Sequence, residues 1–412
     1  MKIAVVGSGI SGLSAAYYLS KKHHVDLFEK DDHFGGHSHT IDVSLDKKKI
    51  SVDIGFIVFN HNTYPNLINF FRENEIKIEK SNMSFSVSVK DTNFEYSGGG
   101  LKGLFSNKSN LFNLKFLNMV FDIISFYKRC DKIDNFDEKI TLGEFLNKEK
   151  LSKSFINYHL IPMVSAIWSM PPYKANKMPL IFFIKFFQNH GLFKLNKRPQ
   201  WYTVSNRSKT YVNKILSKIS GEYFKNYQIN LIKRISYGVQ IYYGGRNEFF
   251  DYDKVVIATH ADEALSLIDD PLQEEKNILS KFTYKENLAI IHTDDKIMPK
   301  NKKTWSSWNS CINQKNFENN SITYWLNLLQ NLTCEQNIFL TLNPLLEIDE
   351  NKILKKVIFT HPYFDRNTLD YQKKLGILQN KKNILFCGSY FGYGFHEDGI
   401  KSSLDMIQTL ND

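Results

Sequence analysis

The stretch KIAVVGSGISGLSAAYYLSKKHHVDLFEKDDHFGGHSHT, residues 2–40, decides the fold. An apolar strand runs into the glycine turn Gly7-Ser-Gly9-Ile-Ser-Gly12, a helical stretch follows, and a second strand ends at Glu29. A strand, a GxGxxG turn, a helix and a second strand closed by an acidic residue form the fingerprint of a dinucleotide-binding βαβ unit. The sequence therefore predicts a dinucleotide at the amino end of the first helix.

Each residue of this turn has a physical role. Gly7 permits the tight turn out of the strand, Gly9 lets a diphosphate approach the backbone, and Gly12 allows the helix to pack closely on the strand. The first helical turn, which includes Ser11, offers free amides and the positive end of the helix dipole to phosphate groups. Glu29 is placed to accept hydrogen bonds from ribose hydroxyls, and its charge would repel the 2′-phosphate of NADP.

Composition limits the class of protein. The chain has 412 residues, of which 42% are hydrophobic and 23% are charged, enough for two domains or one interleaved pair. A net charge of +10 indicates either lysines spread over the surface or attraction to anionic lipid or an acidic substrate. No nucleic-acid-binding motif, metal-binding cysteine spacing or apolar run of membrane-spanning length is present. We therefore expect a reduced, cytoplasmic protein with no metal site.

Strand-like runs of the nucleotide-binding type recur far along the chain. KVVIATH at 254–260 and NILFCGSY at 383–390 are apolar runs that end in small or polar residues. We therefore predict an α/β fold, with α+β character, in which a Rossmann-like domain is assembled from separated segments. A second, interleaved substrate domain then contains a mixed sheet and helices. The predicted boundaries are 1–60, 203–265 and 380–412 for the first domain, and 61–202 and 266–379 for the second.

Several motifs carry a resemblance to a known family. The most specific are GGHSHT at 35–40 and FCGSYFGYGFHEDGIKSSL at 386–404. Supporting motifs are VDIGFIVFN at 52–60, NMSFSVS at 82–88, SAIWS at 165–169, RPQW at 198–201, TYWLN at 323–327, TLNP at 341–344 and THPYFD at 360–365. Together they resemble the FAD-dependent amine oxidase superfamily, which includes phytoene desaturases and protoporphyrinogen oxidases. Within it, the chain is similar to a bacterial group of NAD/FAD-binding proteins.

The resemblance implies FAD and a set of contacts to it. Gly35 and Gly36 would approach the ribityl and pyrophosphate groups, and His37 would donate to phosphate, although His33, His37 and His39 also fit solvated loop positions. The further implied contacts are Gly55 and Phe56 beside the flavin ring, Ile232 and Ala258 on the adenine side, and Gly388, Ser389, Glu397 and Gly399 near the flavin pyrimidine.

The chain departs from the superfamily at two places. Ser389 stands where relatives usually carry an acidic residue, and residues 205–208 (SNRS) replace a Gly-Gly pair. Asn206 is the best non-glycine substitute for a left-handed backbone. Asp53 is expected to be structural rather than catalytic.

Catalytic candidates are few, because a flavin accepts the hydride itself. The protein must place a carbon–hydrogen bond against the ring, exclude water and stabilise the reduced ring. We name Trp168, Tyr393 and His396 as candidates, and His292 as either a base or a satisfied core histidine. Tyr393 with Trp168 or Trp305 would form an aromatic cage for an amine, or all three belong to an ordinary aromatic core.

The favoured hypothesis is an FAD-dependent oxidoreductase that dehydrogenates an apolar, lipid-like substrate such as a modified fatty acyl chain. The second domain is rich in Phe, Leu and Ile, and the amphipathic segment 114–127 either rests on an anionic membrane or forms a core helix. The resemblance also implies a lipid-modifying enzyme as a partner. The basic amphipathic segments indicate that this cytoplasmic protein contacts the inner face of the membrane. The alternatives are an amine oxidase, a redox-neutral flavin isomerase, and a non-catalytic flavin-binding subunit.

Overall fold

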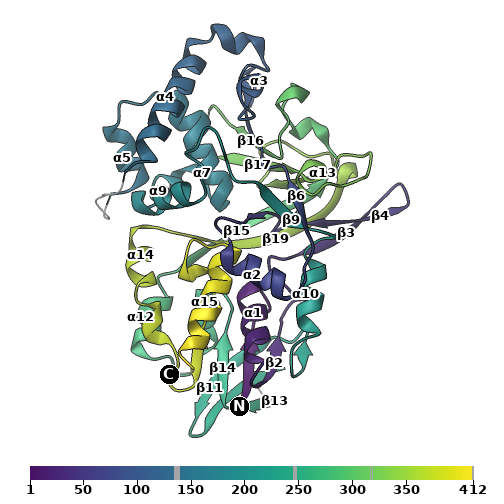
Figure 1. Ribbon diagram of the computed structural model, residues 1–412, viewed down its shortest axis with the longest axis vertical. Coiled ribbons are helices and arrows are strands. Elements are labelled where there is room, and N and C mark those ends of the chain that lie inside the picture. Colours follow the sequence, from purple (N-terminus) through teal and green to yellow (C-terminus); the bar gives the residue numbers. More distant parts are fainter. Residues whose placement is uncertain (134–139, 245–247, 316, 318, 411–412) are drawn as a thin grey trace.

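The computed structural model describes residues 1–133, 140–244, 248–315, 317 and 319–410. The molecule is elongated, with a parallel sheet and both chain ends in its lower part, and a mixed sheet with helices in its upper part (Figure 1). Within the described part of the chain, no helix is long and apolar enough to cross a membrane.

The lower part is built on a five-stranded parallel sheet. Its strands, in spatial order, are β10 (Tyr223–Phe224), β2 (His24–Phe28), β1 (Lys2–Val6), β14 (Lys254–Ile257) and β20 (Ile384–Phe386). β1 is buried from its second residue onward, as expected of a central strand covered on both faces. The prediction that this sheet is assembled from separated segments is confirmed.

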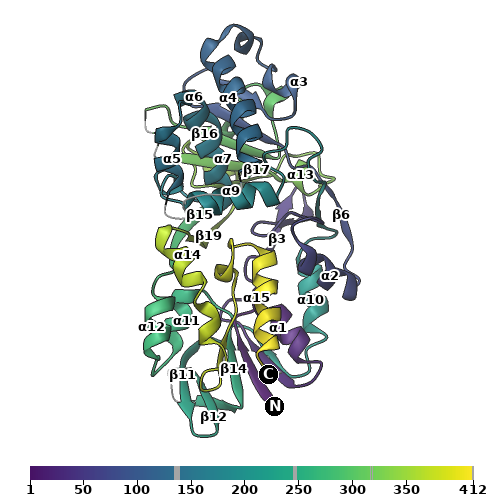
Figure 2. The same ribbon diagram turned by 60° about the vertical axis from the view of Figure 1, so that its left-hand side comes forward.

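Two helices lie side by side on one face of this sheet (Figure 2). They are α1 (Ile10–Leu19) and α15 (His396–Gln408), and small residues let them approach closely. A Cβ at Gly399 would lie only 2.7 Å from Ser11 Oγ, and the hydroxyls of Ser14 and Ser403 are 2.7 Å apart. This contact ties the last helix of the chain to the start of the first.

Further elements surround the parallel sheet. The other face carries a three-stranded antiparallel sheet and two helices, whose apolar side chains share one core with β14 and β20. These elements are β11 (Ile229–Ile235), β12 (Gly238–Tyr243), β13 (Glu248–Tyr252), α11 (Ala261–Leu267) and α12 (Gln273–Leu279). α2 (Pro65–Glu73) and α10 (Lys209–Leu216) pack with α1. α2 and α12 therefore join the lower cores, although the predicted boundaries assign both to the second domain.

The upper part is built on a seven-stranded sheet, in which the pairing of β16 with β7 is parallel and the others are antiparallel. In spatial order the strands are β19 (Ile353–Tyr363), β15 (Thr283–His292), β18 (Phe339–Leu342), β17 (Asn320–Trp325), β16 (Trp308–Ile312), β7 (Phe85–Val89) and β8 (Glu95–Ser97). The long pairing of β15 with β19 lies between the two parts (Figure 1).

A helical layer covers this sheet and holds an aromatic core (Figure 2). Its elements are α3 (Leu101–Leu104), α4 (Leu114–Cys130), α5 (Leu142–Lys148), α6 (Lys153–Phe155), a π-helix (Ile156–Leu160), α7 (Ile161–Trp168), α8 (Pro172–Ala175) and α9 (Leu180–Asn189). Short elements complete the fold: β3 (Thr40–Leu45), β4 (Lys48–Asp53), β5 (Phe59–Asn60), β6 (Ile78–Ser81), β9 (Trp201–Val204), α13 (Leu326–Leu329) and α14 (Arg366–Gln372).

Candidate cofactor and substrate site

One large cavity of about 1400 Å³ connects the two parts of the molecule. At one end, here called the turn end, it is lined by Gly7, Gly9 and Glu29 at the carboxyl edge of the parallel sheet. At the other, the helical end, it is lined by Tyr96 and His159 among the aromatic residues of the upper part. The carboxyl edge of an open parallel sheet is where such folds bind ligands.

The glycine turn has the geometry that the sequence predicts. Gly7 has φ +98°, and a Cβ at Gly12 would lie 1.8 Å from the carbonyl oxygen of Gly7, so the helix could not pack here with any larger residue. A Cβ at Gly9 would meet no described atom within 4 Å, because this position faces open space in the cavity. No described side chain caps the start of α1. The first-turn amides are therefore available to a phosphate group.

Ser8, which the sequence analysis did not single out, joins three parts of the site. Its amide donates to Glu29 Oε2 at 3.0 Å, and its hydroxyl also donates to that oxygen. The hydroxyl accepts the amide of Gly35 at 3.0 Å, and Glu29 Oε1 accepts the amide of Asp31 at 3.0 Å. Glu29 is thus fixed at the end of β2 with its carboxylate on the cavity wall. The signal in the sequence is the serine inside the GxG turn.

His37 is a half-buried residue with a buried, unsatisfied ring nitrogen on the cavity wall. Its Nε2 has no hydrogen-bond partner among the described residues, and its ring centre lies 5.1 Å from those of Phe359 and His361. Burial, reinforced by neighbouring histidines, holds the pKa of His37 well below its usual value, so the ring is neutral. A neutral imidazole with a free nitrogen is a hydrogen-bonding group that a ligand can complete.

Other histidines line the same cavity without forming a metal site. His33 and His39 stack on each other at 3.7 Å, and His260 stacks on Tyr284 at 4.3 Å. Within the described ranges, no three histidine, cysteine or acidic side chains are grouped to hold a metal ion. His396 stacks on Phe56 at 3.7 Å, and burial lowers the pKa of His396 to about 3.

Three of the four catalytic candidates come together on the cavity wall. Trp168, Tyr393 and His396 all line it, and the indole nitrogen of Trp168 donates to the carbonyl of Tyr393 at 3.2 Å. Tyr393 packs against Phe182 with ring centres 4.6 Å apart. Gly388 and Ser389, at the turn after β20, line the wall beside them. This group lies where the turn end meets the upper part.

The fourth candidate, His292, does not line the cavity, so the prediction that it acts as a base is wrong. It is fully buried in β15, where Nε2 is 2.7 Å from Thr341 Oγ1 and Nδ1 accepts the amide of Asp294 at 3.1 Å. Both ring nitrogens are satisfied within the sheet, so His292 is a core histidine. Trp305 is also outside the cavity and donates to the carbonyl of Pro299 at 2.7 Å, so it forms no cage with Tyr393.

Two residues that the resemblance implies as FAD contacts, Ile232 and Glu397, do not line the cavity. Ile232 is fully buried in β11 with its carbonyl bonded to the amide of Asp269 at 3.0 Å, and the preceding Gln228 and Ile229 line the cavity instead. Glu397 binds the start of α2 rather than the cavity, accepting the amides of Asn66 and Leu67 at 3.0 Å.

Three implied glycines also lie behind the cavity wall. Gly12, Gly35 and Gly399 are absent from the lining and act through close packing, whereas Gly36, Gly55, Phe56, Ser11 and Ala258 line it. The packed glycines therefore shape the wall without contacting its contents.

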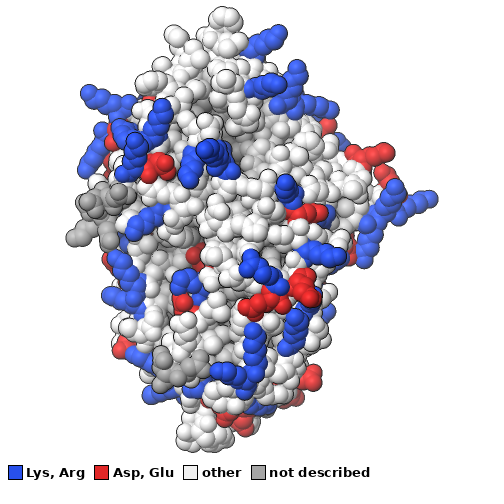
Figure 3. Space-filling view, viewed as in Figure 1, with Lys and Arg blue, Asp and Glu red and all other residues white. Residues whose placement is uncertain are grey.

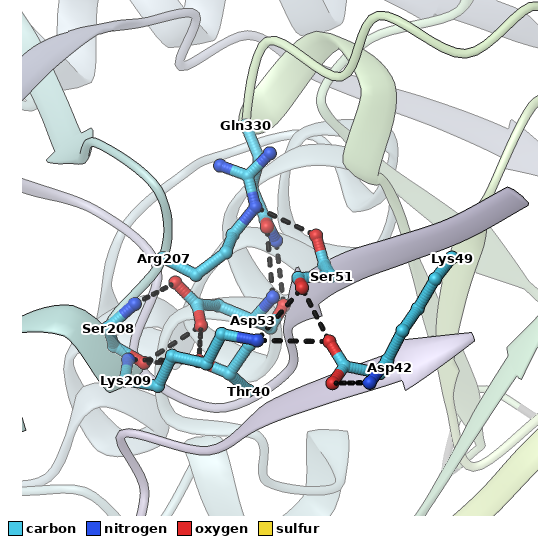
Figure 4. A network of polar contacts seen from close by, with 9 residues as sticks. All are labelled: Thr40, Asp42, Lys49, Ser51, Asp53, Arg207, Ser208, Lys209 and Gln330. Carbon is cyan, nitrogen blue, oxygen red and sulfur yellow. Dashed lines mark hydrogen bonds and ion pairs between the residues drawn. The ribbon is translucent and has the colours of Figure 1, made fainter.

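A buried polar network holds the loop that carries Gly55 (Figure 4). Asp53 Oδ2 accepts the amide of Ser208 at 2.8 Å, and Oδ1 accepts the hydroxyls of Thr40 and Ser208 at 2.5 and 2.8 Å. The side chain of Gln330 pairs with the backbone of Asp53 through bonds of 2.9 and 2.7 Å. Burial raises the pKa of Asp53 despite these bonds. The carboxylate lies outside the cavity and has a structural role.

The helical end contains a Tyr–His–Tyr network that the sequence analysis missed. The Tyr96 hydroxyl donates to the carbonyl of Tyr158 at 2.9 Å, so His159 Nδ1 donates to Tyr96 at 2.9 Å and Nε2 accepts from Tyr127 at 2.8 Å. Burial lowers the pKa of His159 to about 3. His159 lies in the π-helix Ile156–Leu160, a rare conformation that is frequent at functional sites.

Comparisons with known proteins agree with this architecture. A family described as an NAD(P)-binding Rossmann-like domain matches residues 5–73. No curated protein sequence matches the chain.

Solved structures match over nearly the whole length. A candidate protoporphyrinogen oxidase from Exiguobacterium sp. 255-15 is 16% identical, with a TM-score of 0.69 over 99% of this chain and 98% of its own. A fatty acid isomerase from P. acnes that produces CLA is 14% identical, with a TM-score of 0.69 over 99% and 98%. Putrescine oxidase bound to putrescine is 12% identical, with a TM-score of 0.70 over 100% of both chains. Residues 5–73 therefore match the description of an NAD(P)-binding Rossmann-like domain, and the chain has the overall fold of these solved proteins, which confirms the fold implied by its resemblance to the FAD-dependent amine oxidase superfamily.

Proposed function

We propose that this protein binds FAD and dehydrogenates an apolar, lipid-like substrate such as a modified fatty acyl chain. The observation that carries the proposal is the single cavity that continues from the glycine turn to the helical end. Such a cavity has room for a dinucleotide at one end and for an apolar substrate at the other.

The residues of the turn end fit FAD. The uncapped start of α1 and the open space over Gly9 suit a diphosphate, Glu29 suits a ribose, and the unsatisfied Nε2 of His37 suits a phosphate or ribityl oxygen. When bound, FAD supplies a hydride acceptor. With FAD bound, the substrate would lose a hydride and a proton from adjacent carbons, both taken up as FAD becomes FADH2, and would gain a carbon–carbon double bond. Trp168, Tyr393 and Phe395 exclude water from the place where the two ends meet.

The charges along the cavity favour this substrate class over amines. All acidic side chains that line the described cavity wall belong to the turn end: Glu29, Asp31, Asp32, Asp262 and Glu263. An ammonium group at the helical end would meet no carboxylate from that wall. Putrescine oxidase shares the fold, but the lining of this cavity supports an apolar substrate better than a cation.

An exposed apolar surface supports supply of the substrate from a membrane. α4 buries one face in the aromatic core, and its opposite face is apolar and exposed. With the segment before it, this face forms what we call the apolar cap: Leu101, Leu111, Phe112, Leu114, Leu117, Phe121 and Ile124. Phe112 is 89% exposed, Leu114 75% and Phe121 72%. Soluble monomers rarely expose apolar side chains in such a continuous group.

Charge suggests what the apolar cap contacts. Residues 101–130 contain five basic residues and one acidic residue, and Figure 3 shows basic side chains around the white top of the molecule. Lys102, Lys108 and Lys115 make no ion pair with described acidic residues. An apolar surface ringed by lysine matches the interface of an anionic bilayer, on which a helix lies without crossing it. Gly98 and Gly99 line the cavity immediately before the cap begins, so the cap adjoins the helical end.

Two experiments test these proposals. Purified protein is expected to release FAD, identified by mass spectrometry. Anaerobic addition of long-chain acyl lipids is expected to bleach the oxidised flavin. Double-bond migration without net bleaching would instead indicate an isomerase, and bleaching by amines alone would indicate an amine oxidase. A protein without FAD would refute the proposal.

For the apolar cap, wild type is expected to co-float with phosphatidylglycerol vesicles at low salt. The triple variant Phe112→Gln, Leu114→Gln and Phe121→Gln is expected to lose this binding. Tyr237→Gln, at a 70% exposed aromatic in the lower part, is the matched control and should bind as wild type does. Unchanged binding by the triple variant, or a cap that instead mediates self-association in sedimentation, would refute membrane docking.

A further inference from the structure

Arg198 is the one charged residue at the helical end among the cavity-lining residues that the structure describes. It lies in the loop after α9, where its Nε donates to the carbonyl of Lys194 at 2.8 Å. This bond orients the guanidinium and leaves both terminal amino groups without a hydrogen bond to described residues. No ion pair joins Arg198 to a described acidic residue. Its charge is therefore available to a ligand in the cavity.

The described hydrogen-bond network nearest to Arg198 carries no charge. Its positive charge adds to burial in lowering the pKa of His159, so it lies within electrostatic reach of the Tyr–His–Tyr network. That network satisfies its own hydrogen bonds and stays neutral at physiological pH. Nothing in the network therefore neutralises the guanidinium or repels an anion beside it.

Much of the remaining lining at this end is apolar or aromatic, and its polar members, such as Ser84, Ser169 and His190, include no acidic residue. Met163, Phe186, Leu192 and Trp201 share the cavity wall with Arg198. An arginine that has free terminal amino groups recognises a carboxylate through two parallel hydrogen bonds. A chamber with one cation beside an apolar wall fits a ligand with one anionic group and a long apolar chain.

We propose that Arg198 binds the carboxylate of a long-chain fatty acid whose acyl chain lies along the apolar cavity wall. The inference rests on the proposed function, because it names the substrate class of the same cavity. It adds a fixed orientation, since an anchored carboxylate sets which carbon reaches the junction near Trp168 and Tyr393. Chain length would then decide which bond is presented for reaction.

The test is direct binding to the protein as purified, measured by equilibrium dialysis with palmitate and with hexadecanol, its uncharged counterpart. Wild type is expected to bind both, and palmitate more tightly. Arg198→Ala should weaken palmitate binding about tenfold or more and leave hexadecanol within about twofold. Arg198→Lys should recover only part of the loss, because lysine keeps the charge without the planar pair of donors. Lys194→Ala, an exposed charge in the same loop, is the matched control and should bind both ligands as wild type does.

The outcomes distinguish failure of the Arg198 carboxylate anchor from failure of the proposed function. If Arg198→Ala binds palmitate as wild type does, or loses both ligands equally, Arg198 is not a carboxylate anchor, although the apolar substrate site stands. If wild type binds neither palmitate nor hexadecanol, the lipid-like substrate itself is refuted. The flavin content of each variant shows whether it has folded as wild type has.

Discussion

Asn206 and Arg207 show how single residues replace a glycine pair. Both have left-handed backbones, with φ +61° and +77°, as the sequence predicts for Asn206. Arg207 is held by a 2.9 Å bond from Nε to the carbonyl of Ser51, next to the Asp53 network (Figure 4). Asn206 is exposed and its side chain makes no hydrogen bond to a described residue, so its backbone preference is its main contribution.

Asn206→Ala is therefore expected to lower the free energy of unfolding by about 1 kcal/mol, because alanine tolerates a left-handed backbone less well than asparagine. Urea unfolding followed by circular dichroism measures this change. Asn206→Gly is the matched control and should be at least as stable as wild type. Equal stability of the alanine and glycine variants would show that the backbone at this position is not strained.

Asp398 makes stability depend on pH. Its carboxyl is buried at the start of α15 and accepts the amide of Phe395 at 2.9 Å, and burial raises the pKa of Asp398 to about 7. The native state therefore holds a proton that the unfolded chain releases at about pH 4, and the resulting stabilisation is lost as pH rises from about 4 to about 7.

Asp398→Asn should remove this slope while keeping an acceptor for the Phe395 amide. The buried histidines act in the opposite direction: the pKa of His361 is lowered to about 4, so those groups cost stability as pH falls below about 6.5. The informative quantity is thus the difference between wild type and variant in unfolding free energy at pH 5 and pH 8. It should shrink by roughly 1.4 kcal/mol for each pH unit between pH 5 and the raised pKa of about 7. A constant difference would contradict a raised pKa.

Helix ends and strand faces differ in how well the sequence predicts them. The Thr141–Glu144 capping box and the end of α7 just before Met170, Pro171 and Pro172 are local signals that can be recognised in the sequence itself. The direction in which a strand side chain points depends on pairing with strands that are distant in the sequence. His292 turns toward Thr341 because β15 pairs with β18, forty-nine positions away, and no local pattern specifies that register. The hydrogen-bond network of Tyr96, His159 and Tyr127 could not be predicted either, because it joins residues that are far apart in the sequence.

The amino end of α2 is capped by Glu397, a residue of the distant helix α15. α2 begins with Pro65 and has no side-chain cap of its own in the described chain, and Glu397 of α15 supplies two acceptors for its first amides. The family resemblance implies a cofactor contact for Glu397, whereas its actual role as a cap has no signal in the sequence, because the capping residue lies on a helix distant in sequence from α2.

Glu397→Ala is expected to lower the free energy of unfolding by about 1–2 kcal/mol, since it leaves the first amides of α2 unpaired and removes a link between α2 and α15. Thermal unfolding at neutral pH measures this loss. Glu347→Ala, at an exposed glutamate of the upper part, should change stability by less than about 0.5 kcal/mol. A variant as stable as wild type, with unaltered flavin content, would refute the capping role.

The cavity makes the stability of the two parts depend on its contents. Its wall combines Gly9 and Glu29 from the lower part with Trp168, Phe359 and His361 from the upper part. A ligand that reaches across it contacts both cores, and one that fills only the turn end contacts one. Ligand binding to the native state raises stability by about 2.7 kcal/mol when its concentration is one hundred times Kd.

On the proposed function, removal of FAD is therefore expected to lower the melting temperature and to expose cleavage sites in both parts during limited proteolysis. Re-addition of FAD should restore both. ADP, which matches only the portion held by the glycine turn and Glu29, should protect the lower part and leave the upper part as sensitive as in the stripped protein. Mass spectrometry of the fragments assigns each cut to a part. Protection of the upper part by ADP alone would mean that the portion of FAD beyond ADP contributes nothing to holding the two parts together.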